Sequence, residues 1–176
     1  MIVLDNLIRQ ANELLQNDGF EYAFCGGWAI DLFIGAETRK HSDIDILAYW
    51  PDRDTIIQYM QSLGFQVYEM IGGGKARYIT GIHNQIKSKR NIFCCTQGCE
   101  LVCPSATDET GIYFINFNHI GQTKLNFFEF LFNDKDDTDL LYARNHAVKQ
   151  VLSDAILYNG SLPYLSPEMC LLYKST

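Results

Sequence analysis

Residues 23–50 read AFCGGWAIDLFIGAETRKHSDIDILAYW, and this stretch decides the fold. An apolar run leads into Gly26 and Gly27, a helix-compatible stretch follows, and a second apolar run contains Asp43 and Asp45. This spacing predicts a strand, a glycine turn, a helix and a second strand in that order. Alternation of this kind is typical of an α/β domain.

The segments on either side extend the alternation. We expect one helix over about residues 5–17 and another over residues 54–64. From Phe65 onward, β-rich segments separated by Gly, Asn or Pro predict a run of antiparallel strands. Residues 166–168 read SPE, a helix start with a serine cap and a proline at the first position. We therefore expect one α/β (α+β) domain over residues 1–176, with a mixed sheet flanked by helices, a β-rich second half and a C-terminal helix.

The composition restricts the class of partner. Hydrophobic residues make up 47% of the 176 residues and charged residues 20%, which is typical of a globular protein. The net charge of -7 argues against nucleic acid, because phosphate binding along a duplex needs clustered Lys and Arg. We see no signal-peptide block and no apolar run long enough for a membrane helix, so we expect a cytoplasmic protein without a membrane partner.

Asp43 and Asp45 are the first candidates for chemistry. At positions i and i+2 of a predicted strand, their carboxylates leave the same face, about 7 Å apart at the backbone. A close carboxylate pair suits Mg²⁺, a hard cation that prefers oxygen ligands and shares them with substrate phosphates. The alternative is a strand with one polar face in water, because unpaired buried carboxylates are costly.

Gly26 and Gly27 are the candidates for phosphate binding. Between a strand and a helix, a backbone without Cβ can approach a phosphate, and the helix N-terminus offers free N–H groups. An ordinary turn is the alternative for a glycine pair considered alone. Together with the aspartate pair, the glycines favour a site where the backbone meets phosphate and the carboxylates meet metal.

Three segments resemble one known family. They read GGWAIDLF with TRKHSDIDI, FFEFLFND, and LPYLSPEMCLLYKST, and the matched residues fall within 22–50, 124–134 and, for the part of the last segment that ends at LLYK, 162–174. They resemble the nucleotidyltransferase superfamily typified by DNA polymerase beta, in the form found in its aminoglycoside and lincosamide nucleotidyltransferase branch. The resemblance implies the nucleotidyltransferase fold. It also implies a metal-dependent enzyme that transfers a nucleoside monophosphate, AMP from ATP, to a hydroxyl of a small molecule. Antibiotics are among the acceptors that the resemblance implies.

The resemblance also implies roles for individual residues. Asp43 and Asp45 would bind two Mg²⁺ ions, and Glu129 would be the third carboxylate, as a metal ligand or as the acceptor of the hydroxyl proton. An edge-strand glutamate facing water is the alternative for Glu129. The residues that we assign to nucleotide binding are Gly26, Gly27, Trp28, Arg39, His41 and Lys174.

Several of these nucleotide contacts have a plainer alternative. Trp28 stands where the wider superfamily often has a serine, and a core position is the alternative for it. Arg39 and His41 precede the metal strand, where polar residues also form solvated loops. Lys174 matches a family position near the nucleotide, and Glu168 one that orients it, although both suit an ordinary helix face.

Two further patterns carry no function in this interpretation. Residues 72–75 read GGGK but lack the spacing of a phosphate-binding P-loop, and they favour a hairpin. The cysteines between 94 and 103 lack paired C-x-x-C spacing, so buried reduced thiols are expected rather than a zinc site. These cysteines are Cys94, Cys95, Cys99 and Cys103.

We expect a nucleoside triphosphate and a small-molecule hydroxyl acceptor as partners. Members of the resembled branch recognise antibiotics partly through a helical region beyond the catalytic domain, whereas this chain ends at the LLYKST helix. A homodimer, or an acceptor other than an antibiotic, is therefore expected. The alternative function is a non-catalytic nucleotide-binding or toxin–antitoxin partner module of the same fold. Three acids favour catalysis, because a binding module has no need of them.

Overall fold

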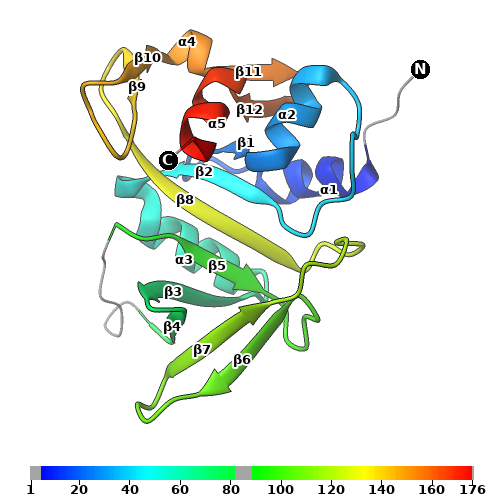
Figure 1. The fold of residues 1–176 in the computed structure, drawn as a ribbon, viewed down its shortest axis with the longest axis vertical. Helices are drawn as coiled ribbons and strands as arrows, with labels where there is room; N and C mark the ends of the chain where they lie inside the picture. Colours follow the sequence, from blue (N-terminus) through cyan, green and yellow to red (C-terminus); the bar gives the residue numbers. More distant parts are fainter. Residues whose placement is uncertain (1–4, 82–88, 176) are drawn as a thin grey trace.

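A mixed β-sheet runs through the computed structural model, which describes residues 5–81 and 89–175 (Figure 1). The strands are β1 Ala23–Cys25, β2 Asp45–Tyr49, β3 Gln66–Gly72, β4 Lys75–Tyr78, β5 Ile92–Cys95, β6 Val102–Ala106, β7 Ile112–Phe117, β8 Phe127–Lys135, β9 Asp139–Leu141, β10 Lys149–Val151, β11 Ile156–Asn159 and β12 Leu162–Leu165. The helices are α1 Asn6–Leu15, α2 Gly26–Ile34, α3 Arg53–Ser62, α4 Leu152–Ala155 and α5 Pro167–Lys174, with a 3-10 turn η1 at Trp50–Asp52. The sheet order is β11-β12-β1-β2-β8-β5-β3-β4-β7-β6, and β9 extends from β8 and pairs with β10. The predicted mixed sheet with flanking helices is confirmed.

The first half follows the predicted alternation, with two differences, at the glycine pair and at Asp43. Helix α1 begins after Asp5, whose side chain accepts a hydrogen bond from the Leu7 N–H at 3.1 Å. Gly26 and Gly27 are the first two residues of α2, so the prediction of a turn before the helix is wrong by two residues. Asp43 lies in the loop before β2, so the prediction that both aspartates share one strand is also wrong.

Strand β8 links the two halves of the sheet. It pairs in parallel with β2 and antiparallel with β5. Phe128, Phe130 and Phe132 are buried on one of its faces, whereas Glu129 and Leu131 lie on the other. Because successive side chains of a strand point to opposite faces, β8 closes the core on one side and presents an acid on the other.

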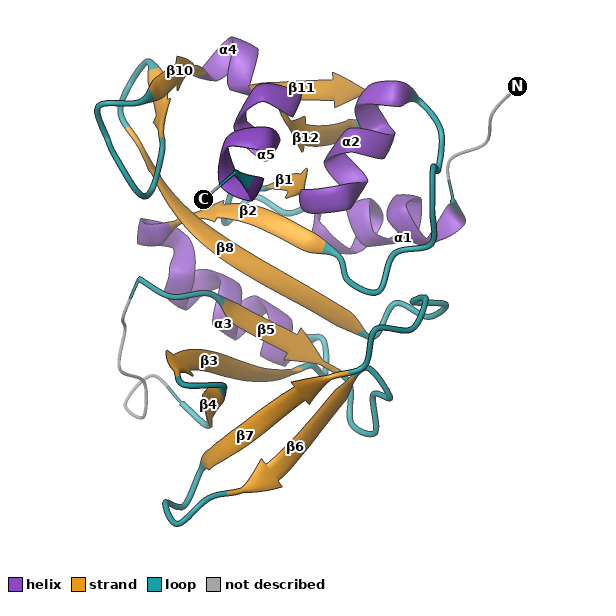
Figure 2. Cartoon of the chain, viewed as in Figure 1, coloured by secondary structure: helices purple, strands orange, loops and turns teal. Residues whose placement is uncertain are grey.

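The face that carries Glu129 is covered at both ends and open between them. Helices α2 and α5 contact each other and lie over β1 and β12 (Figure 2). Beyond β8, aromatic side chains form a second core, in which the Tyr68 and Phe93 rings stack with centroids 4.9 Å apart. The strip along β2 and β8 between these two covers is where the polar side chains lie.

The second half is β-rich as predicted, but not all of its strands pair antiparallel with their neighbours. Besides β8, strand β12 is also parallel to its neighbour, β1. The β11–β12 hairpin was not predicted from the sequence. It leads into α5, which packs beside α2. The start of α5 is as predicted, because Ser166 Oγ accepts a hydrogen bond from the Met169 N–H at 3.3 Å and Pro167 follows the cap.

Residues 82–88 of the β-rich region lie outside the described residues. Within the described part of the chain, every helix is too short or too polar to cross a bilayer.

Phe130→Ala should lower the free energy of unfolding by about 3–5 kcal/mol, because it removes a fully buried ring from the core. Leu131→Ala is the matched control, since Leu131 is next along β8 but on the other face and 37% exposed. Its loss should stay below about 1 kcal/mol. Urea denaturation of both variants measures the difference. Equal losses would contradict the assignment of the two faces of β8.

Candidate active site

Three carboxylates meet on the open strip of the sheet. Asp45 begins β2 and is the register partner of Glu129 on β8, so both side chains leave the same face. Asp43 reaches them from the loop before β2. Each of the three acids offers an oxygen that lies within 4.8 Å of those of the other two. Within residues 5–81 and 89–175, this is the cluster close enough to hold a metal ion.

Burial and mutual repulsion act on the paired acids. Burial, followed by the charges of Asp43 and Glu129, raises the pKa of Asp45 to about 8. Burial and Asp43 also raise the pKa of Glu129, against a hydrogen bond that its carboxylate accepts from Asn91 Nδ2. Acids that repel one another while partly removed from water are stabilised by a divalent cation. Because all the donors are carboxylate oxygens, the cluster fits the expected Mg²⁺.

The glycine pair lies against the same cluster. Gly26 has a φ of 62°, and a Cβ at this position would collide with Asp45 Oδ2. A Cβ on Gly27 would lie 2.7 Å from His41 Nδ1 and 2.8 Å from a guanidinium nitrogen of Arg39. A side chain at either position would therefore displace the groups packed against the first turn of α2.

A buried hydrogen-bond network supports the loop that leads to Asp43. Asp31 of α2 is 1% exposed, and its carboxylate accepts hydrogen bonds from Thr38 Oγ1 at 2.6 Å and from the Thr38 N–H at 3.1 Å. His41 Nε2 lies 2.6 Å from the same carboxylate. The His41 ring packs on Trp28 with centroids 4.4 Å apart. The network ties the loop to α2. Sequence reasoning missed this network, because no pattern distinguished Asp31 from the other residues of the predicted helix.

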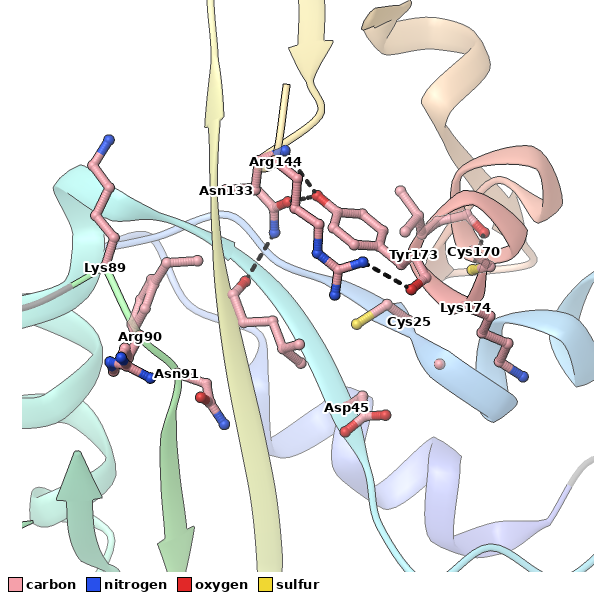
Figure 3. A pocket seen from close by; sticks show the side chains of 15 residues that line it. Cys25, Asp45, Lys89, Arg90, Asn91, Asn133, Arg144, Cys170, Tyr173 and Lys174 are labelled. Atoms are coloured by element: carbon pink, nitrogen blue, oxygen red, sulfur yellow. Dashed lines mark hydrogen bonds between the residues drawn. The ribbon is translucent and has the colours of Figure 1, made fainter. Parts of the chain in front are cut away.

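A pocket of about 530 Å³ opens beside the carboxylates (Figure 3). The polar and charged residues that line it are Asp45, Lys89, Arg90, Asn91, Asn133, Arg144, Tyr173 and Lys174. Figure 3 shows that they come from both sides of β8, with Lys89 to Asn91 on one side and the end of α5 on the other. Four of them are cations, in a chain with a net charge of -7. Positive charge concentrated in this way suits a triphosphate.

One wall of the pocket is held in place by Tyr173. Its hydroxyl donates a hydrogen bond to Asn133 Oδ1 on β8 and accepts one from the Ala143 N–H at 3.3 Å. Arg144 Nη1 donates to the Tyr173 carbonyl oxygen at 3.2 Å. The end of α5 is thus joined to β8 and to the segment that follows β9. Sequence reasoning missed Arg144 and the Lys89–Asn91 wall, because these residues lie outside any motif. Asn133 and Tyr173 lie within two of the quoted motif segments, but they were assigned no role there.

The structure brings together only part of the nucleotide-binding set predicted from the sequence. Gly26 and Lys174 line the pocket beside the acids. Arg39 is exposed and lies close to Gly27. Trp28 and His41 are 2% and 4% exposed and pack on each other. Their burial places them in the support of the loop rather than in the lining of the pocket.

Cys94 and Cys95 of β5, Cys99 of the following turn and Cys103 of β6 do not converge on one point. Cys94 belongs to the main core, whereas Cys95 and Cys99 belong to the second aromatic core. Cys103 is exposed. The expected burial is confirmed for Cys94, Cys95 and Cys99 and is wrong for Cys103.

Two comparisons with known proteins found similarities. Residues 7–78 match the family described as Aminoglycoside-2''-adenylyltransferase. The structure is similar to the crystal structure of the lincosamide antibiotic adenylyltransferase LnuA with lincomycin bound. The TM-score is 0.55 at 16% sequence identity, over 98% of this chain and 87% of that chain. No curated protein matches the sequence.

The two comparisons bear on different predictions. At 16% identity the structural likeness shows the fold, so the predicted nucleotidyltransferase fold is confirmed. The family match covers the segment with the glycine pair and both aspartates. It supports the resemblance to aminoglycoside and lincosamide nucleotidyltransferases and the prediction of a nucleotidyltransferase enzyme.

The metal-free protein should become less stable as the pH rises from about 4 to 8. The folded pKa of Asp45 is about 8 against an ordinary value of 3.8, so the protonated acid stabilises the fold at low pH and this contribution is lost as the pH rises. Asp45→Asn, which is neutral at every pH, should flatten the decline. Mg²⁺ should raise the unfolding temperature of the wild type at about pH 8 and have little effect on the variant.

Thermal unfolding at about pH 5 and pH 8, with and without Mg²⁺, measures these differences. Asp108→Asn, an exposed acid in a loop, is the control and should behave as the wild type. If the unfolding temperature of Asp45→Asn kept the full dependence on pH and Mg²⁺, Asp45 would not be the source of that dependence.

Proposed function

We propose that the chain is a metal-dependent nucleotidyltransferase that moves AMP from ATP to a hydroxyl group of a lincosamide or aminoglycoside antibiotic. The observation that carries this proposal is the meeting of Asp43, Asp45 and Glu129 beside a pocket lined by four cations. The matched family and LnuA are both described as adenylyltransferases, which supports AMP as the transferred group and an antibiotic as the acceptor.

The carboxylate cluster would hold the metal. Asp43, Asp45 and Glu129 would bind divalent cations through oxygen atoms alone, which favours Mg²⁺. Two such ions, when bound, supply charge neutralisation for the triphosphate and for the attacking and leaving oxygens. The register of β2 and β8 sets Asp45 beside Glu129 in the metal-free protein, so the two carboxyl groups are positioned before a cation binds.

The reaction is an in-line displacement at the α-phosphorus of ATP. The acceptor oxygen forms a bond to the α-phosphorus, while the bond from that phosphorus to the oxygen bridging to the β-phosphate breaks and pyrophosphate leaves. We assign the hydroxyl proton to Glu129, because Glu129 is the cluster acid on β8 and its carboxylate oxygens can accept a proton. The hydrogen bond from Asn91 orients that carboxylate.

The basic pocket would hold the triphosphate and then the pyrophosphate. Lys89 and Arg90 lie on one side of β8, and Arg144 and Lys174 lie on the other, so phosphate oxygens between them meet positive charge from two directions. The first turn of α2, which begins at Gly26, adds N–H groups at a helix N-terminus. These cations stabilise the charge that develops on the leaving group.

Asp45→Asn should lower the rate of pyrophosphate release by about a hundredfold or more, because it removes a carboxylate from the metal cluster. The assay contains the protein, ATP, Mg²⁺ and lincomycin or an aminoglycoside, and it measures released pyrophosphate. The exposed Asp108→Asn is the control and should keep the wild-type rate. Tight nucleotide binding without Mg²⁺ dependence, unchanged in Asp45→Asn, would favour the non-catalytic module instead.

Lys174→Ala should raise the KM for ATP by about tenfold, because it removes one charge-assisted contact to phosphate. The KM for the acceptor should stay within about twofold, since Lys174 lines the nucleotide side of the site. Arg9→Ala on α1 removes an exposed cation that is distant from Lys174 in the sequence, and it serves as the control. Initial-rate kinetics with each substrate varied in turn measure both constants. A KM for ATP equal to that of the wild type would exclude Lys174 from the triphosphate site.

A further inference from the structure

A second hollow, of about 90 Å³, adjoins the carboxylate cluster. Asp43 and Glu129 line this hollow, whereas Asp45 lines the basic pocket, and the two hollows share no lining residue. The other lining residues of the small hollow are Ser42, Leu101, Phe117, Asn118, His119 and Phe127. The three acids thus separate two hollows of different chemistry.

The small hollow has an apolar wall at the edge of the second aromatic core. The Phe117 and Phe127 rings meet edge to face with centroids 5.9 Å apart, and Phe117 also packs on Phe93 at 5.4 Å. Phe117 is nevertheless 37% exposed, so part of its ring is available beside the acids. Leu101 completes the apolar surface. Such a surface binds carbon-rich groups rather than phosphate.

The polar side of the hollow carries few charges. Ser42, Asn118 and His119 add hydroxyl, amide and imidazole groups that can hydrogen-bond to hydroxyls. The only acids in the lining are Asp43 and Glu129, and both belong to the metal cluster. A ligand with several ammonium groups would therefore lack carboxylates to pair with, whereas a ligand with an apolar group and hydroxyls matches the lining.

The direction of the reaction assigns the two hollows. In an in-line displacement the attacking and leaving oxygens lie on opposite sides of the phosphorus. The basic pocket suits the leaving pyrophosphate, so the acceptor approaches the cluster from the other hollow. That hollow includes Glu129, which we have assigned to the hydroxyl proton.

We propose that this small hollow is the acceptor subsite. It takes the hydroxyl-bearing part of a molecule with an apolar group and at most one positive charge, in preference to a polycationic aminoglycoside. The proposal rests on the nucleotidyltransferase function and specifies the acceptor for it. At about 90 Å³ the hollow holds only part of such a molecule, and the rest lies over the exposed edge of Phe117.

Calorimetric titration tests the proposal on the full chain saturated with Mg²⁺ and a non-hydrolysable ATP analogue. The probes are lincomycin, which carries an alkyl chain, hydroxyls and one amine, and kanamycin, which carries several amines. Kanamycin should bind the wild type at least about tenfold more weakly than lincomycin does. Phe117→Ala should weaken lincomycin binding about tenfold, whereas analogue binding should change less than about twofold.

Two further variants make the result independent of folding. Phe114→Ala is the matched control, because Phe114 lies on the same strand, is 45% exposed and faces Lys75 Nζ rather than the hollow. His119→Ala changes an exposed loop residue of the hollow and should weaken lincomycin binding about threefold or more without loss of packing. If Phe117→Ala fails to fold by thermal unfolding, His119→Ala decides the location.

Different outcomes would overturn different parts of the proposal. Wild-type lincomycin binding in both hollow variants would show that the acceptor binds elsewhere. Tighter binding of kanamycin than of lincomycin, or no binding of either, would refute the acceptor class. In both cases, analogue binding that depends on Mg²⁺ and is lost in Asp45→Asn would leave the proposed function standing. Loss of that nucleotide binding in the wild type would overturn the function and the subsite together.

Discussion

The parallel pairing of β2 with β8 is the constraint on which the site depends. The register joins Asp45 to Glu129, and the pairing continues to Tyr49 and Asn133. A slip of one residue along β8 would turn Glu129 toward the core and Phe130 toward water. Removing a fully buried ring from the core is costly, so the phenylalanines of β8 fix the position of the acid between them.

The carboxylate cluster lowers the stability of the metal-free fold. Burial and repulsion raise the pKa values of Asp45 and Glu129, which means that their charged forms destabilise the metal-free protein. The surroundings nevertheless keep the acids together. Gly26 leaves room for Asp45, and the contact of His41 with Asp31 holds the loop that leads to the cluster. A divalent cation bound between the carboxylates would relieve this repulsion.

The predictions from sequence succeeded where the pattern is local. The order of strand, helix and strand around Gly26 and the cap at Ser166 follow from neighbours a few residues apart. The β11–β12 hairpin and the walls of the basic pocket depend on pairing between distant segments, which no local pattern contains. Trp28 and His41 lie next to candidate site residues in sequence, but Trp28 points inward from the first turn of α2 and His41 is buried from the loop after α2, against Trp28 and Asp31.

One row of the sheet connects the metal cluster to the aromatic core. Asp45 is the register partner of Glu129, Glu129 of Phe93, and Phe93 of Tyr68, so all four side chains leave the same face. The Phe93 ring in turn supports Phe117, which borders the small hollow. The basic pocket shares no lining residue with that hollow, so changes in the aromatic core would alter the proposed acceptor subsite and leave the lining of the basic pocket unchanged. Under the proposed function, acceptor choice and nucleotide binding would be carried by different parts of one sheet face.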